Sequence, residues 1–138
     1  INNYPCQTNK NGNNNDVTYQ DCRLIYKSMK KTVFYGMKCA FSGVIPMNRD
    51  PQSHGLWQLI KEYGGEPCDA LSNDITHLIV AKIGTAKCQK VKKDNMNCWI
   101  VHYNWVYQSM ISFHKLNEHN YNLHSSTQIS SHINNLTQ

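Results

Sequence analysis

Acidic side chains and long apolar runs are scarce in this chain of 138 residues. Nine Asp and Glu stand against fourteen Lys and Arg, which gives a formal charge of +5 and a pI near 8.9. Charged residues make up 17% and hydrophobic residues 40% of the sequence, both below the averages of globular domains. No apolar run approaches the roughly 18 residues of a membrane span, and no signal peptide opens the sequence. We therefore expect no membrane contact, and the basic excess favours anionic partners.

Paired cysteines and clustered metal ligands are also missing. The six cysteines are spread singly, without a C-x-x-C pair: Cys6, Cys22, Cys39, Cys68, Cys88 and Cys98. This spacing indicates neither a zinc knuckle nor a disulfide framework, so we expect reduced thiols in a cytosolic or nuclear protein. His114, His119 and His124 recur every five residues, which does not place them on one helix face. We expect no metal site and no cofactor.

Signatures of common enzymes are absent as well. The sequence has no Asp-x-Asp-x-Thr phosphatase loop, no G-x-x-x-x-G-K-S/T loop, no H-E-x-x-H helix and no G-x-S-x-G turn. We therefore expect no catalytic residues and no catalysis by this chain. The first residue is Ile, which indicates a fragment of a longer protein.

One compact domain fits the length, and its limits follow the apolar residues. Residues 1–20 are rich in Asn and almost without apolar pattern, so we interpret them as a disordered linker. Residues 21–120 carry the periodic apolar positions and should form the compact domain. After Phe113 the sequence returns to Asn, His and Ser. We expect little structure there and a polar tail at 121–138.

Hydrophobic periodicity predicts alternating strands and helices. The segment 55–65 has apolar residues at i, i+3, i+4 and i+7, one face of a helix that a double glycine ends. The continuous apolar run within 75–81 indicates a strand buried on both faces. Other strands are expected at 38–45, 66–69 and 98–101, and other helices at 21–31, 85–93 and 105–110. This order predicts an α/β fold: a four-stranded parallel sheet flanked by three helices, with an extra N-terminal helix. Trp105 should be buried against the sheet.

Two segments should meet at the carboxyl edge of this sheet, where parallel sheets bind their ligands. Ser42-Gly43 leaves the first strand at this edge, and Thr85 and Lys87 begin the helix after the third strand. A hydroxyl, a glycine amide, a helix N-terminus and an ammonium together can hold a phosphate. Lys87 opposes the helix dipole by about 0.3–1 kcal/mol, a conflict that a bound anion would relieve. The same residues also fit an ordinary turn, an N-cap and a solvated lysine, so spacing leaves both interpretations open.

Lysines are frequent in and before the same predicted helix. No acidic residue interrupts them until Asp94, and they are Lys82, Lys87, Lys90, Lys92 and Lys93. Such a series could steer a phosphorylated peptide or a nucleic acid, and solvated helix faces have the same composition. Aromatic residues for base stacking are not interleaved with the lysines. We therefore favour a phosphorylated peptide or protein over nucleic acid as the partner.

Taken in order, these motifs resemble the BRCT domain. The resemblance covers about residues 36–111 and rests on Phe41-Ser42-Gly43, Trp57, Gly64-Gly65, Thr76-His77-Leu78-Ile79-Val80, Gly84-Thr85-x-Lys87, and Trp105 four residues before Ser109. BRCT domains have a four-stranded parallel sheet flanked by three helices, and many bind phosphoserine or phosphothreonine peptides. The resemblance implies that Ser42, Gly43, Thr85 and Lys87 bind phosphate.

A narrower resemblance concerns the BRCT region of the RNA polymerase II C-terminal-domain phosphatase. It rests on the helix before the first strand, the 81–85 junction and the exit sequence FHKLNEHNY. In that exit, Phe113 and Asn117 stand where the family more often has Trp and Asp. The resemblance implies a nuclear module that docks a Ser/Thr phosphatase on the phosphorylated polymerase tail, with the catalytic domain outside this chain. The alternative is a scaffold or DNA-end-binding BRCT of a repair or replication protein.

Overall fold

The computed structural model describes residues 21–123, so the linker predicted at 1–20 and all but the first three residues of the tail predicted at 121–138 lie outside the described residues. Four strands and four helices make up the described part. The strands are β1 (Lys38–Ser42), β2 (Glu66–Pro67), β3 (His77–Val80) and β4 (Trp99–His102). The helices are α1 (Cys22–Thr32), α2 (Gly55–Glu62), α3 (Ala86–Lys93) and α4 (Asn104–Ser112), with short 3₁₀ turns η1 (Pro51–Ser53) and η2 (Glu118–Tyr121). The predicted order of elements is confirmed.

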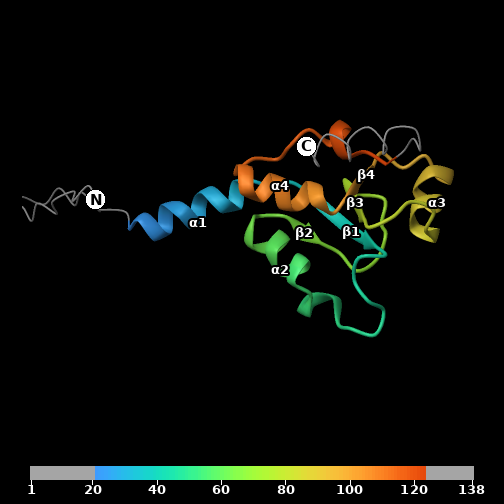
Figure 1. The fold of residues 1–138 in the computed structure, drawn as a ribbon, viewed down its shortest axis with the longest axis horizontal. Coiled ribbons are helices and arrows are strands. Elements are labelled where there is room, and N and C mark those ends of the chain that lie inside the picture. The colour runs from blue at the N-terminus through green and yellow to red at the C-terminus, as the bar shows by residue number, and fades with distance from the viewer. Residues whose placement is uncertain (1–20, 124–138) are drawn as a thin grey trace, which may run out of the picture.

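The strands form one parallel sheet in the order β2-β1-β3-β4 (Figure 1). The central pair runs from Cys39 beside His77 to Ser42 beside Val80, and β4 continues the same register beside β3. β1, β2 and β3 are shorter than predicted, and β4 has the predicted length. β1 ends at Ser42 because Gly43 takes a φ of +69°, a conformation that suits glycine and turns the chain out of the sheet. Ser42 therefore stands at the carboxyl edge.

Each face of the sheet has its own hydrophobic core, because successive side chains of a strand point to opposite faces. On one face the sheet packs against α2 and α4 through Phe41, Ile79, Val101, Trp57 and Trp105. On the other face it packs against α3 through Ala40, Leu78, Ile100, Cys88 and Val91. The prediction of helices on both faces is confirmed. Trp105 is fully buried, as expected.

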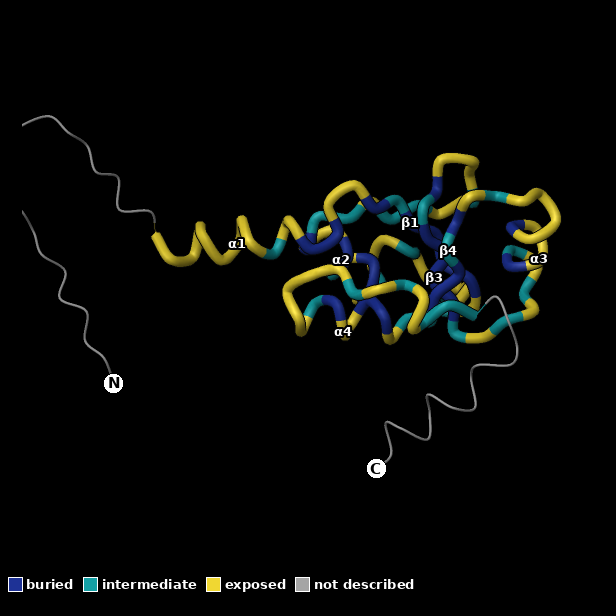
Figure 2. The backbone as a smooth tube through the Cα atoms, turned by 90° about the horizontal axis from the view of Figure 1, so that it is seen from above, coloured by how far each residue is buried: buried dark blue, intermediate teal, exposed yellow. Residues whose placement is uncertain are grey.

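α1 projects from the body of the domain (Figures 1 and 2). None of its residues is buried, and Leu24, Ile25 and Met29 are exposed. An isolated helix of this length is marginal in water, so its contacts with the domain at the C-terminal end matter for its stability. There Phe34, which follows the helix, is fully buried in the core.

The double glycine at the end of α2 permits this contact between α1 and the domain. Gly64 has a φ of +89°, and a Cβ at this position would overlap the backbone carbonyl of Lys31. Next to it, Phe34 N donates a hydrogen bond to Tyr63 O at 2.9 Å. The sequence predicted Gly64 only as a helix stop. The structure adds that the absence of a side chain there lets the end of α1 approach α2.

The segment after α4 is ordered where little structure was expected. Residues 114–123, which we call the C-terminal strap, run back over the sheet and include η2. Leu116 N donates to Ser109 Oγ at 3.1 Å, and Trp105 Nε1 donates to Leu116 O at 3.0 Å. At its end, Leu123 N donates to a carbonyl of β4 at 3.0 Å. The expectation is wrong for the strap because it is held by these polar contacts and by Leu116, Tyr121 and Leu123, which pack on the two cores without a regular spacing in the sequence.

The cysteines contribute to packing. All five in the described part are free thiols, and burial raises the pKa of Cys39 and raises that of Cys98 to about 11. Both therefore stay protonated at neutral pH and behave as small apolar residues. Within residues 21–123, no three His, Cys, Asp or Glu side chains are placed to share a metal ion, and no helix is long and apolar enough to cross a bilayer.

Candidate functional site

The structure brings the four predicted site residues together at the carboxyl edge of the sheet. We call Ser42, Gly43, Thr85 and Lys87 the carboxyl-edge cluster. The hydroxyl oxygens of Ser42 and Thr85 lie 2.6 Å apart, although 43 positions separate them in sequence. Lys87 Nζ lies 2.9 Å from the carbonyl oxygen of Phe41, the residue before Ser42. The four residues are therefore neighbours in space, and their binding of phosphate stays a prediction.

Thr85 has a structural role of its own, as the N-cap of α3. Its hydroxyl accepts a hydrogen bond from Cys88 N at 3.3 Å. The N-cap interpretation is thus correct. A cap does not exclude anion binding, because the N-terminus of a helix presents unpaired amides and a positive dipole end to the same space. No acidic residue stands in the first turn of α3 to neutralise that end.

Lys87 is held in place, which differs from the solvated lysine of the alternative interpretation. Its ammonium donates to Phe41 O at 2.9 Å and to Asp69 O at 3.2 Å, and so ties β1 to the loop after β2. The side chain is partly buried, whereas Lys90 and Lys93 are exposed. None of the ion pairs found within residues 21–123 involves Lys87. Its positive charge therefore meets only neutral carbonyl groups.

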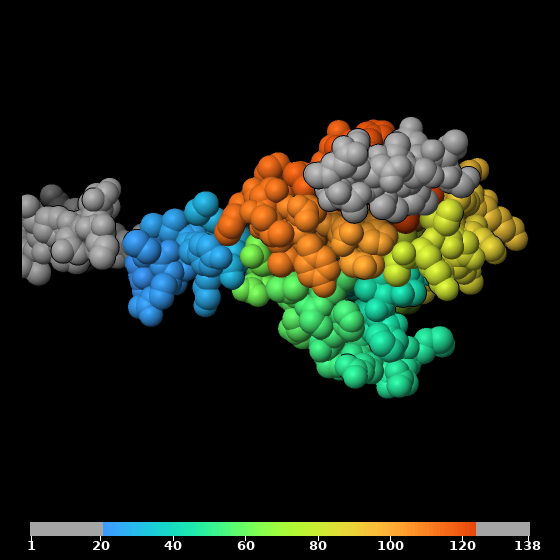
Figure 3. Space-filling model, in the orientation of Figure 1, coloured from blue at the N-terminus to red at the C-terminus, as the bar shows by residue number. Residues whose placement is uncertain are grey.

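The carboxyl-edge cluster lies in a cleft of about 620 Å³. The loop from β1 to η1 lines the cleft with Ile45, Pro46, Met47 and Arg49, and Trp57 of α2 also contributes. In Figure 3 the chain after β1 forms a lobe below the body, apart from α3 (yellow). Arg49 was not predicted from the sequence, because a loop cation without periodic neighbours gives no signal of which surface it faces.

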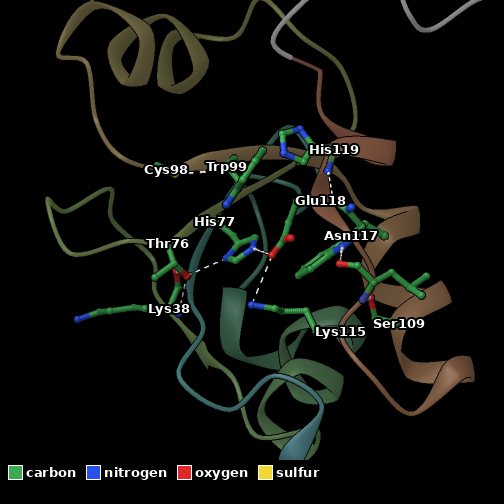
Figure 4. Close-up of polar contacts among 12 residues, drawn as sticks. Lys38, Thr76, His77, Cys98, Trp99, Ser109, Lys115, Asn117, Glu118 and His119 are labelled. Atoms are coloured by element: carbon green, nitrogen blue, oxygen red, sulfur yellow. Dashed lines mark hydrogen bonds and ion pairs between the residues drawn. The ribbon is translucent and has the colours of Figure 1, made fainter.

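A second polar cluster lies at the opposite end of β3 and surrounds the buried His77 (Figure 4). We call Thr76, His77, Lys115 and Glu118 the His77 cluster. His77 is 3% exposed, with Nδ1 2.8 Å from Thr76 Oγ1 and Nε2 2.9 Å from Glu118 Oε1. Lys115 Nζ lies 3.4 Å from the same carboxylate. The imidazole stacks on Trp105 with ring centroids 4.8 Å apart. The strap therefore closes over His77.

The charge states of the His77 cluster follow from burial and pairing. Burial lowers the pKa of His77 below its usual 6.5, against the opposite influence of Glu118. Burial alone would raise the pKa of Glu118, but hydrogen bonds from His77 and the backbone, together with Lys115, bring it below 4.5. At pH 7 a neutral His77 therefore donates its Nε2 hydrogen to an ionised Glu118. Within residues 21–123 every buried side-chain nitrogen and oxygen has a hydrogen-bond partner, so we interpret this cluster as structural.

A family model of the twin BRCT domain matches residues 38–105. These residues form a BRCT domain. An RNA polymerase II C-terminal domain phosphatase of Schizosaccharomyces pombe is 36% identical over 103 residues, which is 75% of this chain and 14% of the relative. A solved structure of the fission yeast RNA polymerase II CTD phosphatase Fcp1 matches with a TM-score of 0.68 and 36% identity, over 73% of this chain and 28% of that one.

The BRCT fold is shared with more distant structures. Rad4 BRCT1,2 in complex with a Crb2 phosphopeptide matches with a TM-score of 0.55 and 21% identity, over 65% of this chain and 46% of that one. The chain spans only 8% to 24% of the length of the curated relatives it matches. It is thus related to the BRCT region of CTD phosphatases. α1 and the strap lie outside the segment that the family model matches.

Proposed function

We propose that this BRCT module binds a phosphorylated serine or threonine peptide through the carboxyl-edge cluster. The observation that carries the proposal is the convergence of the Ser42 hydroxyl, at the end of β1, with the Thr85 hydroxyl and the Lys87 ammonium, at the start of α3, in one cleft. The phosphopeptide complex of Rad4 BRCT1,2, which shares the fold, supports the same class of ligand.

The donors of the cluster suit a phosphate. A phosphoserine carries about −1.5 to −2 charges at pH 7 and has three strong acceptor oxygens. Ser42 is only 6% exposed, so a phosphate would reach its hydroxyl from the cleft. The Gly43 amide and the first amides of α3 supply further N–H groups. Two of the three N–H groups of Lys87 already meet carbonyls, which leaves one for the phosphate and fixes the ammonium before binding.

For the parent protein we infer a targeting role. The curated relatives are phosphatases named for the C-terminal domain of RNA polymerase II. The module would hold such a phosphatase on the phosphorylated polymerase tail, in the nucleus. Any phosphatase activity would need residues outside this chain, since the sequence lacks an Asp-x-Asp-x-Thr loop.

The test is peptide binding by the full chain, measured by fluorescence anisotropy with a phosphorylated polymerase-tail peptide and its unphosphorylated form. Lys87→Met keeps the aliphatic stem and removes the charge, so it should weaken phosphopeptide binding by about 1.5–3 kcal/mol, the range for hydrogen bonds to charged groups. The matched control is Lys90→Met, which removes an exposed lysine one turn further along α3 and should change binding little.

A second variant separates binding from folding. Lys87 also ties β1 to the loop after β2, so the melting temperature of Lys87→Met is measured beside its affinity. Ser42→Ala removes a single hydroxyl and should weaken binding similarly, and the double variant should be less than additive because both groups contact one phosphate. Equal binding of phosphorylated and unphosphorylated peptides, or tighter binding of a 5′-phosphorylated DNA duplex, would overturn the proposal.

A further inference from the structure

The cleft is much larger than a phosphate. Its volume of about 620 Å³ lies within the roughly 300–1,000 Å³ of pockets that hold drug-sized ligands. The carboxyl-edge cluster occupies part of its lining, and much of the remainder comes from the β1–η1 loop and from Trp57. A phosphate bound by Ser42 and Lys87 would therefore leave most of the cleft to other parts of the ligand.

Most residues that line this remaining part of the cleft are apolar. Ile45, Pro46 and Met47 follow one another in the loop that lines it. Met47 is fully exposed, at 105% of its reference surface, whereas Ile45 packs partly against the core. An exposed methionine is a frequent component of binding surfaces, because its flexible thioether adapts to different apolar side chains. The loop thus offers a ligand both a fixed surface at Ile45 and an adaptable one at Met47.

The charges around the cleft favour an anionic ligand at one position only. Lys87 and Arg49 are cations that line it, and Asp69 is the carboxylate residue that does so. One phosphate suits this balance, and an apolar group suits the wall of three apolar residues beside it. Consecutive residues of an extended peptide lie about 3.3–3.6 Å apart along the chain, so a side chain one or two positions from the phosphoresidue falls within the same cleft.

We propose that the cleft selects phosphopeptides with an apolar residue within two positions of the phosphorylated serine or threonine. The apolar side chain packs on Ile45, Pro46 and Met47 while the phosphate occupies the carboxyl-edge cluster. This inference rests on the proposed function, since it assumes that the phosphate binds at Ser42 and Lys87. It goes further by assigning sequence specificity to a lone BRCT domain through the loop after its first strand.

A positional series of peptides tests the inference with the full chain. Each peptide carries one phosphoserine in a Gly-Ser background, with a single Leu at position −2, −1, +1 or +2, and the reference peptide has no Leu. We expect at least one Leu peptide to bind on the order of tenfold more tightly than the reference, which corresponds to about 1.4 kcal/mol. Equal affinity of all phosphopeptides would overturn this inference and leave phosphate binding intact. Failure of every phosphopeptide to bind would overturn the proposed function as well.

A pair of variants locates the effect on the loop. Met47→Ser should reduce the preference for the Leu peptide over the reference peptide to less than about threefold, below 0.7 kcal/mol. The matched control is Ile111→Ser, an exposed apolar residue on α4 that does not line the cleft. It should leave both affinities unchanged. Both side chains are exposed, so unfolding is not expected. A Leu preference that survives Met47→Ser in full, or that Ile111→Ser abolishes, would overturn the assignment.

Discussion

The two polar clusters lie at opposite ends of the sheet and both contain a lysine and a threonine, yet their charged groups have different partners. In the His77 cluster the strap supplies Glu118 and Lys115, and His77 is 3% exposed. In the carboxyl-edge cluster Lys87 meets two neutral carbonyls and faces a cleft. The difference shows that the residue type does not separate a structural polar group from a candidate binding group. The partners of the group make this distinction. A charge paired within the chain contributes to stability, and a charge that meets only carbonyls remains available to an anion.

Trp105→Ala should have the largest effect on stability, and it removes a side chain that packs against the His77 cluster. The indole is fully buried, stacks on His77 and donates a hydrogen bond to Leu116 O. Its loss should lower the free energy of unfolding by about 3–5 kcal/mol, as for other large aromatic residues replaced by alanine. Urea and thermal unfolding measure this. A variant with an unchanged melting temperature would contradict the assignment of Trp105 to the core.

Glu118→Ala should have the next largest effect, because it leaves the Nε2 hydrogen of His77 buried without its acceptor. We expect a loss of about 1–3 kcal/mol of stability, the cost of an unsatisfied buried donor. The matched control is Glu62→Ala, which breaks an ion pair with Lys30 in which the Glu62 side chain is 51% exposed, and such pairs contribute about 0–1 kcal/mol. Phosphopeptide affinity should not change in either variant. Equal stability losses in the two would show that the strap does not depend on this contact.

Lowering the pH should reduce the stability of the domain through the His77 cluster. The folded state lowers the pKa of His77 below 6.5, so the unfolded chain binds the proton first as the pH falls, and the free energy of unfolding decreases below about pH 6.5. Glu118, whose pKa is also lowered, adds a further decrease below about pH 4.5. Urea unfolding at pH 7.5 and 5.5 measures the first step. His77→Gln should reduce this difference in the free energy of unfolding only in part. The partly buried His102, whose pKa is also lowered, contributes in the same direction. An unchanged slope would argue against a neutral His77.

Ser42→Ala should have the smallest effect on stability. It tests the comparison of the two clusters at the carboxyl-edge cluster. The variant loses a hydrogen bond between two hydroxyls, which contributes about 0.5–1.5 kcal/mol. We expect the melting temperature to fall slightly and phosphopeptide affinity to fall clearly. The reverse result, a large loss of stability with unchanged affinity, would place Ser42 with the structural residues and remove the contrast between the two clusters.

The sequence was sufficient for the strands, the helices and the core, because their apolar residues repeat with the period of each element. Trp105 and the run before residue 81 are examples, and both are buried as predicted. The sequence was also sufficient to predict that Ser42 and Thr85 lie close together, because parallel strands of one sheet end at the same edge. Strand ends were predicted less well, because Gly43 leaves the sheet before the apolar run ends.

Contacts between distant segments could not be predicted in the same way. The strap is held by Glu118, by the carbonyl of Leu116 and by the amide of Leu123, and isolated polar residues and backbone groups leave no periodic pattern. The close approach of Lys31 to Gly64 could not be predicted from the sequence either, because a glycine after a helix is already explained as a helix stop. The contacts of Lys87 with Phe41 O and Asp69 O depend on where β1 and the loop after β2 lie relative to α3.

The strap has a further consequence for the two outer strands of the sheet. An outer strand presents unpaired backbone groups that can join a strand of another molecule, the first step of many aggregation reactions. On one side β2 is only two residues long and ends in Pro67, which has no N–H to donate. On the other side Asn122 forms an antiparallel bridge with Val101 of β4. The strap therefore covers the outer edge of β4, which is the longer of the two outer strands. Removal of the strap should make the domain prone to self-association as well as less stable.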